Sequence, residues 1–585
     1  MVTNRFSLKM SLMVTLSTAQ KQIIEHEGSC SVIGAPGTGK TEVLIERVIR
    51  LVEKGVTPED IYIVAFTYYS WQILTGQLRK RLGDVVDRLN IGTFRIFAQH
   101  QIEADEGKEF VFSSDKQARR YLRQAMREVS FKGSAVEAEH IIRNFKSLAR
   151  KPQENAPHHD LLNAYRRFCE LDRYDVLRKH IIGIRQSHYN KVPMKYMFVD
   201  NIQDITRIQF LWLVDHINAG TIASVFGDDD LCAFKRDGSI GGQAFIDLQD
   251  VGSVKAFNLA HSYRISSKLG LAAEDIVGRL KGRLPKDISY NESKEIKVTC
   301  DAYGSAEEEL MVITQQVKGM DRSKRVGVIT RTDWDALRVQ RAFEKHGIEH
   351  SSFAHKIWEI PGAIMVLDLL CLLLNQATDT HLRNVLIGYG LNQSLIDSLF
   401  KGGLHALDWL PTGAKLPKDI SLPQGALAEY TAIQRQLVGY YTLIRSGAAS
   451  PQDIFKAASF DMVENMNKED RLNALVAVDT LVNLKGSLRE VLPQIREGRE
   501  PNVHDQVIVG PVRDMRNLEF DVVYIPFATK ATYPYSGYSV LPVDDSHDCR
   551  LFYMAVTRAS EAVRLSWHGV ESSYVSIFKK SFKTS

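Results

Sequence analysis

The 585-residue sequence has few cysteines and no long apolar run, and each absence removes a class of protein. Its six cysteines are scattered and none forms a C-x-x-C pair, so neither a disulfide framework nor a zinc site is indicated. The longest apolar run, residues 364–374, contains Asp368 and is shorter than the about 20 residues that a membrane-spanning helix needs. We therefore expect a cytoplasmic protein with no membrane partner.

A large excess of one charge is also missing. The formal net charge is +4, with 44% hydrophobic and 25% charged residues, which is the composition of an ordinary globular protein. A single hydrophobic core does not grow to this length, so we expect about three to five domains. The sequence contains no internal repeat and no long low-complexity linker.

The most informative motif that is present lies at residues 29–41. A short β-prone run leads into G-x-x-x-x-G-K-T and then into an amphipathic helix. Such glycines let backbone N–H groups face a β-phosphate, and the helix N-terminus adds its positive dipole end. Lys40 would reach the β- and γ-phosphates, and the Thr41 hydroxyl would bind Mg²⁺. A chance glycine loop is the alternative, but the strand and helix on either side disfavour it.

Further apolar runs predict a parallel sheet with helices on its faces, with strands near 61–66, 90–94, 196–199 and 224–227. The run at 196–199 ends at Asp200, where a carboxylate would suit a second Mg²⁺ contact. The run at 224–227 ends in Asp228, Asp229 and Asp230. These three acids are read either as part of the same site or as a turn that caps a helix.

Residues 95–190 read as helices, and Lys and Arg outnumber Asp and Glu there. One helical face carries a basic stripe made of Lys116, Arg120, Arg123 and Arg127. The stripe is either a solvated surface or a contact to a phosphate backbone. From Leu259 a second α/β unit is expected, with strands near 296–299, 326–330, 507–509 and 522–525, and residues 376–500 read as a helical insertion.

Taken in order, these motifs resemble the UvrD/Rep branch of superfamily 1 DNA helicases. The resemblance runs from Leu16 to about Leu565. It rests on the segments 16–20, 34–41, 65–67, 92–94, 199–204, 227–230, 262–264, 326–348, 518–523 and 551–559.

The resemblance implies an α/β fold with two RecA-like P-loop domains, ATP in the cleft between them, and a mainly helical domain inserted into each. The first RecA-like domain is expected at 1–94 and 191–262, with its insertion at 95–190. The second is expected at 263–375 and 501–585, with its insertion at 376–500.

The resemblance also implies ATP and Mg²⁺ as cofactors, and movement along single-stranded or partly duplex DNA from 3′ to 5′. The catalytic residues would be Lys40, Asp200, Gln203, Arg264 and Arg558. The ATP-binding residues would be Gln20, Gly34, Ala35, Pro36, Gly37, Thr38, Gly39, Lys40, Thr41, Tyr263 and Glu519, with Thr41 and Asp200 on the metal. The DNA-binding residues would be Phe66, Thr93, Phe234 and Arg513.

Several positions depart from the family pattern. Asn201 stands where the family has the carboxylate that activates water, and Leu231 stands where it has a glutamine near the γ-phosphate. An amide cannot accept a proton at neutral pH, although Gln203 could orient the water. The other departures are Tyr68, Tyr69, Arg95, Arg236, Asp237, Arg513, Arg516 and Asn517.

Two hypotheses follow from these departures. The first is an ATP-driven DNA translocase or helicase with slow hydrolysis. The second is an ATP-binding, hydrolysis-impaired DNA clamp that serves a nuclease or another DNA-processing partner. A P-loop kinase or GTPase of unrelated function would leave both arginine motifs unexplained.

Overall fold

The computed structural model divides the chain into two compact units. The first unit runs through residue 331 and resumes at 512, and the second holds residues 332–511. The structure describes residues 16–109, 113, 115–132, 135–147, 158–169, 175, 194–234, 238–354, 358, 361–410, 424–466, 468–483, 487–490, 492, 501–534 and 545–584.

The first unit contains a six-stranded parallel sheet with the strand order β3-β2-β4-β5-β1-β6. Its strands are β1 (Ser29–Gly34), β2 (Ile61–Val64), β3 (Asn90–Gly92), β4 (Tyr196–Val199), β5 (Ile222–Gly227) and β6 (Val254–Leu259). The central strands are near-continuous apolar runs, as expected for strands that are buried on both faces.

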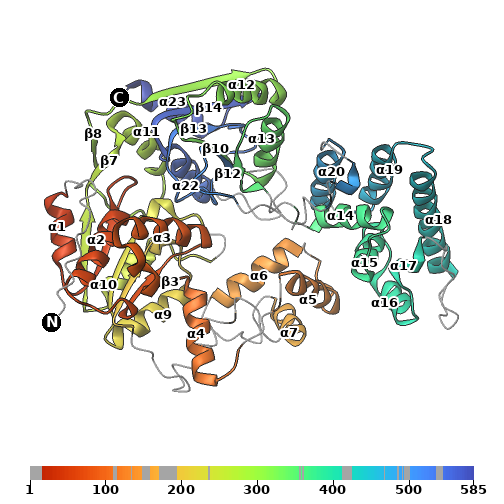
Figure 1. Ribbon diagram of the computed structural model, residues 1–585, viewed down its shortest axis with the longest axis horizontal. Coiled ribbons are helices and arrows are strands. Elements are labelled where there is room, and N and C mark those ends of the chain that lie inside the picture. Colours follow the sequence, from red (N-terminus) through yellow and green to blue (C-terminus); the bar gives the residue numbers. More distant parts are fainter. Residues whose placement is uncertain are drawn as a thin grey trace. The chain divides into compact units, whose positions relative to one another are not determined.

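Helices cover both faces of this sheet (Figure 1). One face packs against α1 (Thr18–Glu25), α2 (Lys40–Glu53) and α3 (Tyr68–Leu82). The other packs against α4 (Phe94–Glu106), α9 (Arg207–Asn218) and α10 (Gln243–Gln249). Thr67 and Thr93 follow strand ends and cap α3 and α4 through their side-chain oxygens, so each helix begins directly after its strand.

Three helices between α4 and β4 have a small apolar core of their own. They are α5 (Asp115–Glu128), α6 (Ala135–Ser147) and α7 (His159–Phe168). Arg120 and Arg127 of the basic stripe are exposed on α5. The side chain of Lys116 lies outside the described residues.

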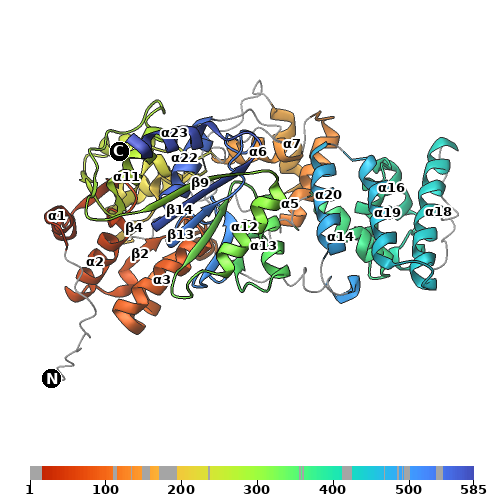
Figure 2. The same ribbon diagram turned by 90° about the horizontal axis from the view of Figure 1, so that it is seen from above.

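The first unit also holds four strands of a second parallel sheet, in the order β10-β13-β14-β9. They are β9 (Lys297–Tyr303), β10 (Val326–Thr330), β13 (Phe520–Ile525) and β14 (Ala559–His568). Figure 2 shows β9, β14 and β13 side by side. The helices α11 (Ser267–Val277), α12 (Ala306–Lys318), α22 (Asp545–Val556) and α23 (Ser573–Thr584) accompany these strands. A short parallel pair joins β7 (His261–Ser266) to β8 (Ser289–Asn291).

The second unit is mainly helical. It contains α13 (Asp333–Lys345) and the parallel pair β11 (Ser351–Ser352) and β12 (Val507–Pro511). A single apolar core joins α14 (Pro361–Leu373), α15 (Asp379–Gly388), α16 (Gln393–Lys401), α17 (Ala406–Trp409), α18 (Gln424–Ser446), α19 (Pro451–Glu464) and α20 (Lys468–Asn483) (Figure 1).

The α/β class with two parallel sheets is confirmed. The predicted strands lie close to observed ones, and β10 coincides with the predicted residues 326–330, but the sequence reading missed β6, β7, β8, β11 and β14. Two predicted strands were too long: β2 ends at Val64 and β3 at Gly92. The threonine caps explain the second error, because Thr93 already belongs to the helix that follows. The domain boundaries stay predictions. Among the described residues, no helix is both long and apolar enough to cross a membrane.

Candidate functional site

Most predicted site residues of the first sheet follow the carboxyl ends of its strands. The glycine loop follows β1, Phe66 follows β2, Thr93 follows β3, Asp200 follows β4 and Asp228 follows β5. Carboxyl ends of parallel strands meet at one edge of a sheet, which is where such sheets bind ligands. The topology therefore gathers residues from five distant segments.

The glycine loop between β1 and α2 has the curled backbone of a phosphate cradle. Gly37 and Gly39 have positive φ angles of 78° and 81°, which disfavour residues with a side chain. The Lys40 Nζ donates hydrogen bonds to the carbonyl oxygens of Gly34 at 2.6 Å and Ala35 at 2.9 Å. Thr38 Oγ1 also donates to the Ala35 oxygen, at 2.9 Å. The ammonium is thus held at the loop, where a phosphate oxygen could replace a carbonyl.

Gln20, predicted to read adenine, contacts this loop directly. Its Nε2 donates to the Thr38 oxygen at 3.2 Å, while its Oε1 accepts from the Ser17 backbone N–H at 2.9 Å. A Cβ added to Gly39 would lie 2.5 Å from Gln20 Nε2. The side chain therefore supports the loop, and its adenine contact stays a prediction.

Strand β7 supports the loop from the other side. Ser262 Oγ donates to the Pro36 oxygen at 2.7 Å, and the Tyr263 backbone N–H donates to the Gly37 oxygen at 2.9 Å. The Tyr263 ring is 41% exposed and so is accessible to a base. Ser262 was assigned no role from the sequence, because its partner lies more than 200 residues away along the chain.

Asp200 lies beside a chain of amides. Asn201, at φ 58°, donates from its backbone N and its Nδ2 to the two Asp200 oxygens, both at 3.0 Å. Gln203 Nε2 donates to Asn201 Oδ1 at 3.2 Å, and Gln203 Oε1 accepts from the Asp228 N–H at 3.0 Å. Both ends of the Gln203 amide are thus engaged within the protein.

The electrostatics link Lys40 to these acids. Burial lowers the pKa of Lys40 to about 8, while attraction by Asp228 and Asp200 opposes that shift and Arg558 adds to it. Burial raises the pKa of Asp200, and Lys40 opposes that rise. These mutual effects place Lys40, Asp200, Asp228 and Arg558 around one site.

The two predicted arginine fingers come close to each other. Arg264 Nη2 donates to the Thr557 oxygen at 3.1 Å and forms an ion pair with Glu519, the predicted ribose contact. Arg558 Nε donates to the Met554 oxygen at 3.2 Å. Burial lowers the pKa of Arg558 to about 10, and burial together with Arg558 holds the pKa of Arg264 well below its usual range. An anion between these two cations would be stabilised.

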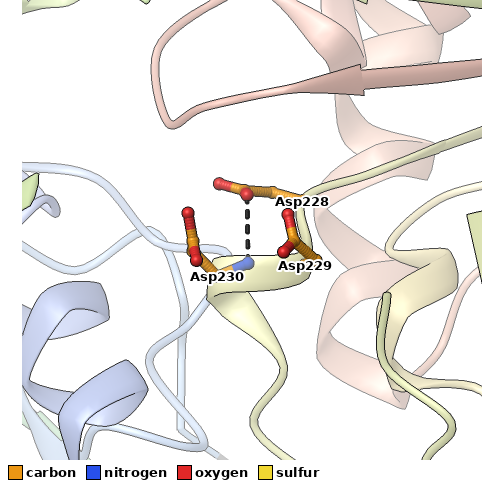
Figure 3. Close-up of side chains that lie close together, drawn as sticks. All are labelled: Asp228, Asp229 and Asp230. Carbon is orange, nitrogen blue, oxygen red and sulfur yellow. Dashed lines mark hydrogen bonds between the residues drawn. The ribbon is translucent and has the colours of Figure 1, made fainter. Parts of the chain in front are cut away.

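Asp228, Asp229 and Asp230 turn their carboxylates toward one another (Figure 3). Lys286 Nζ bonds to all three, at 2.5, 2.5 and 2.6 Å, and Arg283 forms two bonds of 2.7 Å to Asp230. These carboxylates raise the pKa of Lys286. A lysine ammonium therefore stands where three carboxylates could have held a metal. Asp228 also caps the short turn that follows by accepting from the Asp230 N–H at 3.1 Å, as one reading of the sequence predicted.

The predicted DNA-binding aromatics form a pair that includes an unexpected arginine. The Phe66 and Phe234 ring centroids are 5.1 Å apart. The Arg516 guanidinium lies 4.7 Å from each centroid, and its Nη1 donates to Asp204 Oδ2 at 2.6 Å. Burial raises the pKa of Asp204 to about 6, against the opposing effect of Arg516.

The other predicted DNA contacts are Thr93 and Arg513. Thr93 Oγ1 is occupied in capping α4, and Arg513 is exposed. Among the departures, Leu231 is buried and Tyr68 is 48% exposed. Arg236 and Asp237 lie outside the described residues. None of these positions shows by itself what it binds, so their DNA roles stay predictions.

Comparisons with known proteins agree with this architecture. Residues 16–235 match the family model of the UvrD/REP helicase N-terminal domain. The chain is 19% identical to the ATP-dependent DNA helicase PcrA of Staphylococcus aureus, with 95% of this chain and 83% of that protein aligned. It is 20% identical to a probable DNA helicase II homolog of Rickettsia conorii, with 93% and 90% aligned. These matches support a UvrD-like helicase.

Proposed function

We propose that the protein is an ATP-dependent single-stranded DNA translocase or helicase of the UvrD type, with slow ATP hydrolysis and 3′ to 5′ movement. The observation that carries the proposal is that Lys40 lies in the glycine loop, Asp200 follows β4 at the same sheet edge, and Arg264 lies against Gly37 of the loop and bonds to the Thr557 carbonyl, next to Arg558. The similarity to DNA helicases along nearly the whole chain supports the same conclusion.

The residues present suit ATP with Mg²⁺. The left-handed glycines and the Lys40 ammonium fit a triphosphate, and Thr41 and Asp200 would hold the metal. The exposed Tyr263 ring would stack on adenine beside Gln20, and Glu519 would contact the ribose. Mg²⁺ would neutralise charge on the phosphates, and Arg264 and Arg558 would stabilise the charge that develops during transfer.

Slow hydrolysis is proposed because of what lies next to Asp200. The Asn201 side-chain amide donates to Asp200 Oδ2 and accepts from Gln203, and it cannot take a proton from water. Leu231 is buried and offers no hydrogen bond to a γ-phosphate. Phosphoryl transfer depends mainly on positioning and charge, so turnover would be reduced without being lost.

The same observation favours one alternative, a DNA clamp that binds ATP but does not hydrolyse it and that serves a nuclease or other DNA-processing partner. The alternative keeps the roles of Lys40 and Tyr263 and removes only the chemistry at Asn201. The two functions therefore differ in whether the bound ATP is hydrolysed.

Steady-state phosphate release with and without oligothymidylate separates them. The proposal expects slow release that DNA stimulates and that Lys40→Ala abolishes. ATP-analogue and DNA binding without any phosphate release above that of Lys40→Ala would select the clamp. Displacement of a short strand from substrates with a 3′ or a 5′ tail then tests unwinding and its direction.

DNA binding is tested independently of ATP. We expect sequence-tolerant binding of single strands that weakens steeply with salt, because phosphate charges and stacked bases would supply the contacts. Affinity that does not change with salt would contradict a nucleic-acid function altogether.

A further inference from the structure

Arg516 fills the surface on which DNA bases are proposed to stack. Its guanidinium lies 4.7 Å from the centroids of both Phe66 and Phe234, and the residue is only 5% exposed. The two rings are 5.1 Å apart, which is the separation of rings in direct contact. A base could not enter between them without moving the rings or the arginine.

The arginine is held there by a buried ion pair. Arg516 Nη1 donates to Asp204 Oδ2 at 2.6 Å, and the other Asp204 oxygen accepts from the Ala233 N–H at 2.9 Å. Both charged side chains are buried, at 5% and 0% exposure. A fixed acceptor on the first sheet thus orients the guanidinium over both rings.

Arg516 does not use all of its hydrogen-bond donors. Its Nε and Nη2 are buried and have no hydrogen-bond partner among the described residues. Buried donors without acceptors are costly, so this arrangement is less stable than a fully bonded one. If Arg516 moved to a position where these two donors found acceptors, the gain would offset part of the cost of separating its buried pair with Asp204.

The backbone at Arg516 and Asn517 also lies next to residues of the proposed ATP site. The Arg516 carbonyl oxygen accepts a hydrogen bond from Arg558 Nη1, and the adjacent Asn517 accepts from Asn201 Nδ2 at 3.3 Å. Asn517 Nδ2 also donates to Ser70 Oγ on α3. A movement that carried the backbone of residues 516 and 517 with the Arg516 side chain would therefore disturb the bonds of Arg558 and Asn201.

We propose that Arg516 is an internal plug that occupies the Phe66–Phe234 pair in place of a base, and that single-stranded DNA must displace it to bind. The inference rests on the proposed DNA function. A cation over an aromatic ring and a stacked base have comparable strengths, so DNA can compete with the plug. Where displacement also shifts the Arg516 backbone, it changes the hydrogen bond that Arg558 makes to the Arg516 carbonyl and so links DNA binding to the ATP site.

The test compares the same substitution at two arginines of one loop. Arg516→Gln should tighten binding of oligothymidylate about three- to tenfold. The slope of log affinity against log salt concentration should not change, because no phosphate contact is lost. The exposed Arg513 is the matched control, and Arg513→Gln should weaken binding and reduce the slope. Arg516→Lys keeps the charge for Asp204 and should bind like the parent.

Unchanged or weaker binding by Arg516→Gln would overturn the plug, and a reduced slope would identify Arg516 as a phosphate contact. Phe66→Ala separates this result from a failure of the proposed function. If the parent binds and Phe66→Ala weakens it, DNA binding stands even where the plug fails. If neither the parent nor Arg516→Gln binds single strands, the DNA function and the plug fail together.

A second measurement needs no variant, in case Arg516→Gln leaves Asp204 unpaired and does not fold. Phenylglyoxal modifies accessible arginines, and mass spectrometry resolves Arg516 from Arg513. Arg516 should be protected in the free protein and become several-fold more reactive with oligothymidylate, which contains no guanine to consume the reagent. Unchanged or lower reactivity with DNA would overturn the proposal.

Discussion

The glycine loop and the acidic segments at residues 200–204 and 228–231 lie at the same edge of one sheet, yet their polar groups are engaged differently. Among the residues that the structure describes, the Lys40 ammonium donates to backbone carbonyls alone. In the acidic segments, side chains bind other side chains: Asn201 binds Asp200, Arg516 binds Asp204, and Lys286 binds three aspartates. A ligand at the loop replaces carbonyl contacts, whereas chemistry at the acidic segments requires that internal pairs separate.

This difference separates binding from turnover. Nucleotide binding should depend on the loop and tolerate changes in the acidic segments, whereas turnover should respond to the acidic segments. The four predictions below are tests of that separation.

The largest effect is expected at Lys40. Lys40→Ala should weaken binding of a fluorescent ATP analogue about 10- to 100-fold, because it removes a charge-assisted contact to phosphate. Lys54→Ala is the matched control, because Lys54 follows the same helix and its ammonium forms an exposed ion pair with Glu27. Equal affinity of the parent and Lys40→Ala would show that the nucleotide binds elsewhere.

The second prediction concerns Asn201 in the acidic segments. Asn201→Glu should raise DNA-stimulated phosphate release about tenfold, since it restores a group that can take a proton from water. The double change with Leu231→Gln should exceed either single change if both positions act on one phosphate. Analogue affinity should stay near that of the parent.

Asn201→Gln controls for the positive φ at this position, because it brings the same backbone strain without a carboxylate. A parent that already turns over rapidly and is slowed by Asn201→Glu would show that the site has rebuilt its chemistry around the asparagine.

The sequence predicted the elements and the loop but not the contacts that occupy the acidic segments. Strands are set by local apolar runs and the loop by local glycines, so both are visible in the sequence. Lys286 and Arg516 reach partners that are distant along the chain, and no periodicity indicates such pairs. Asp204 was assigned no role from the sequence for the same reason.

The third prediction uses the depressed pKa of Lys40, about 8. Below pH 8 the amine is charged and favours phosphate, so analogue affinity should fall about five- to tenfold from pH 7 to pH 9. Stability should change in the opposite direction, because the unfolded chain holds this proton more tightly and deprotonation above pH 8 favours the folded state. The affinity of Lys40→Ala should not follow this profile, and an identical decline in that variant would assign the titration to another group.

The smallest effect is expected at Ser262, which touches the loop but no predicted reacting group. Ser262→Ala removes the hydrogen bond from Oγ to the Pro36 oxygen and also the bond that Oγ accepts from the Ile265 N–H. Of these two, the bond to Pro36 reaches the loop, and losing it costs about 1 kcal/mol, so KM for ATP should rise about fivefold. The value of kcat should not change, because the acidic segments keep their contacts. Ser289→Ala on the partner strand β8 is the control and should alter neither constant, since Ser289 is exposed. A fall in kcat for Ser262→Ala with no change in KM would mean that the loop contributes to chemistry as well as to binding, and the separation between the two regions would not hold.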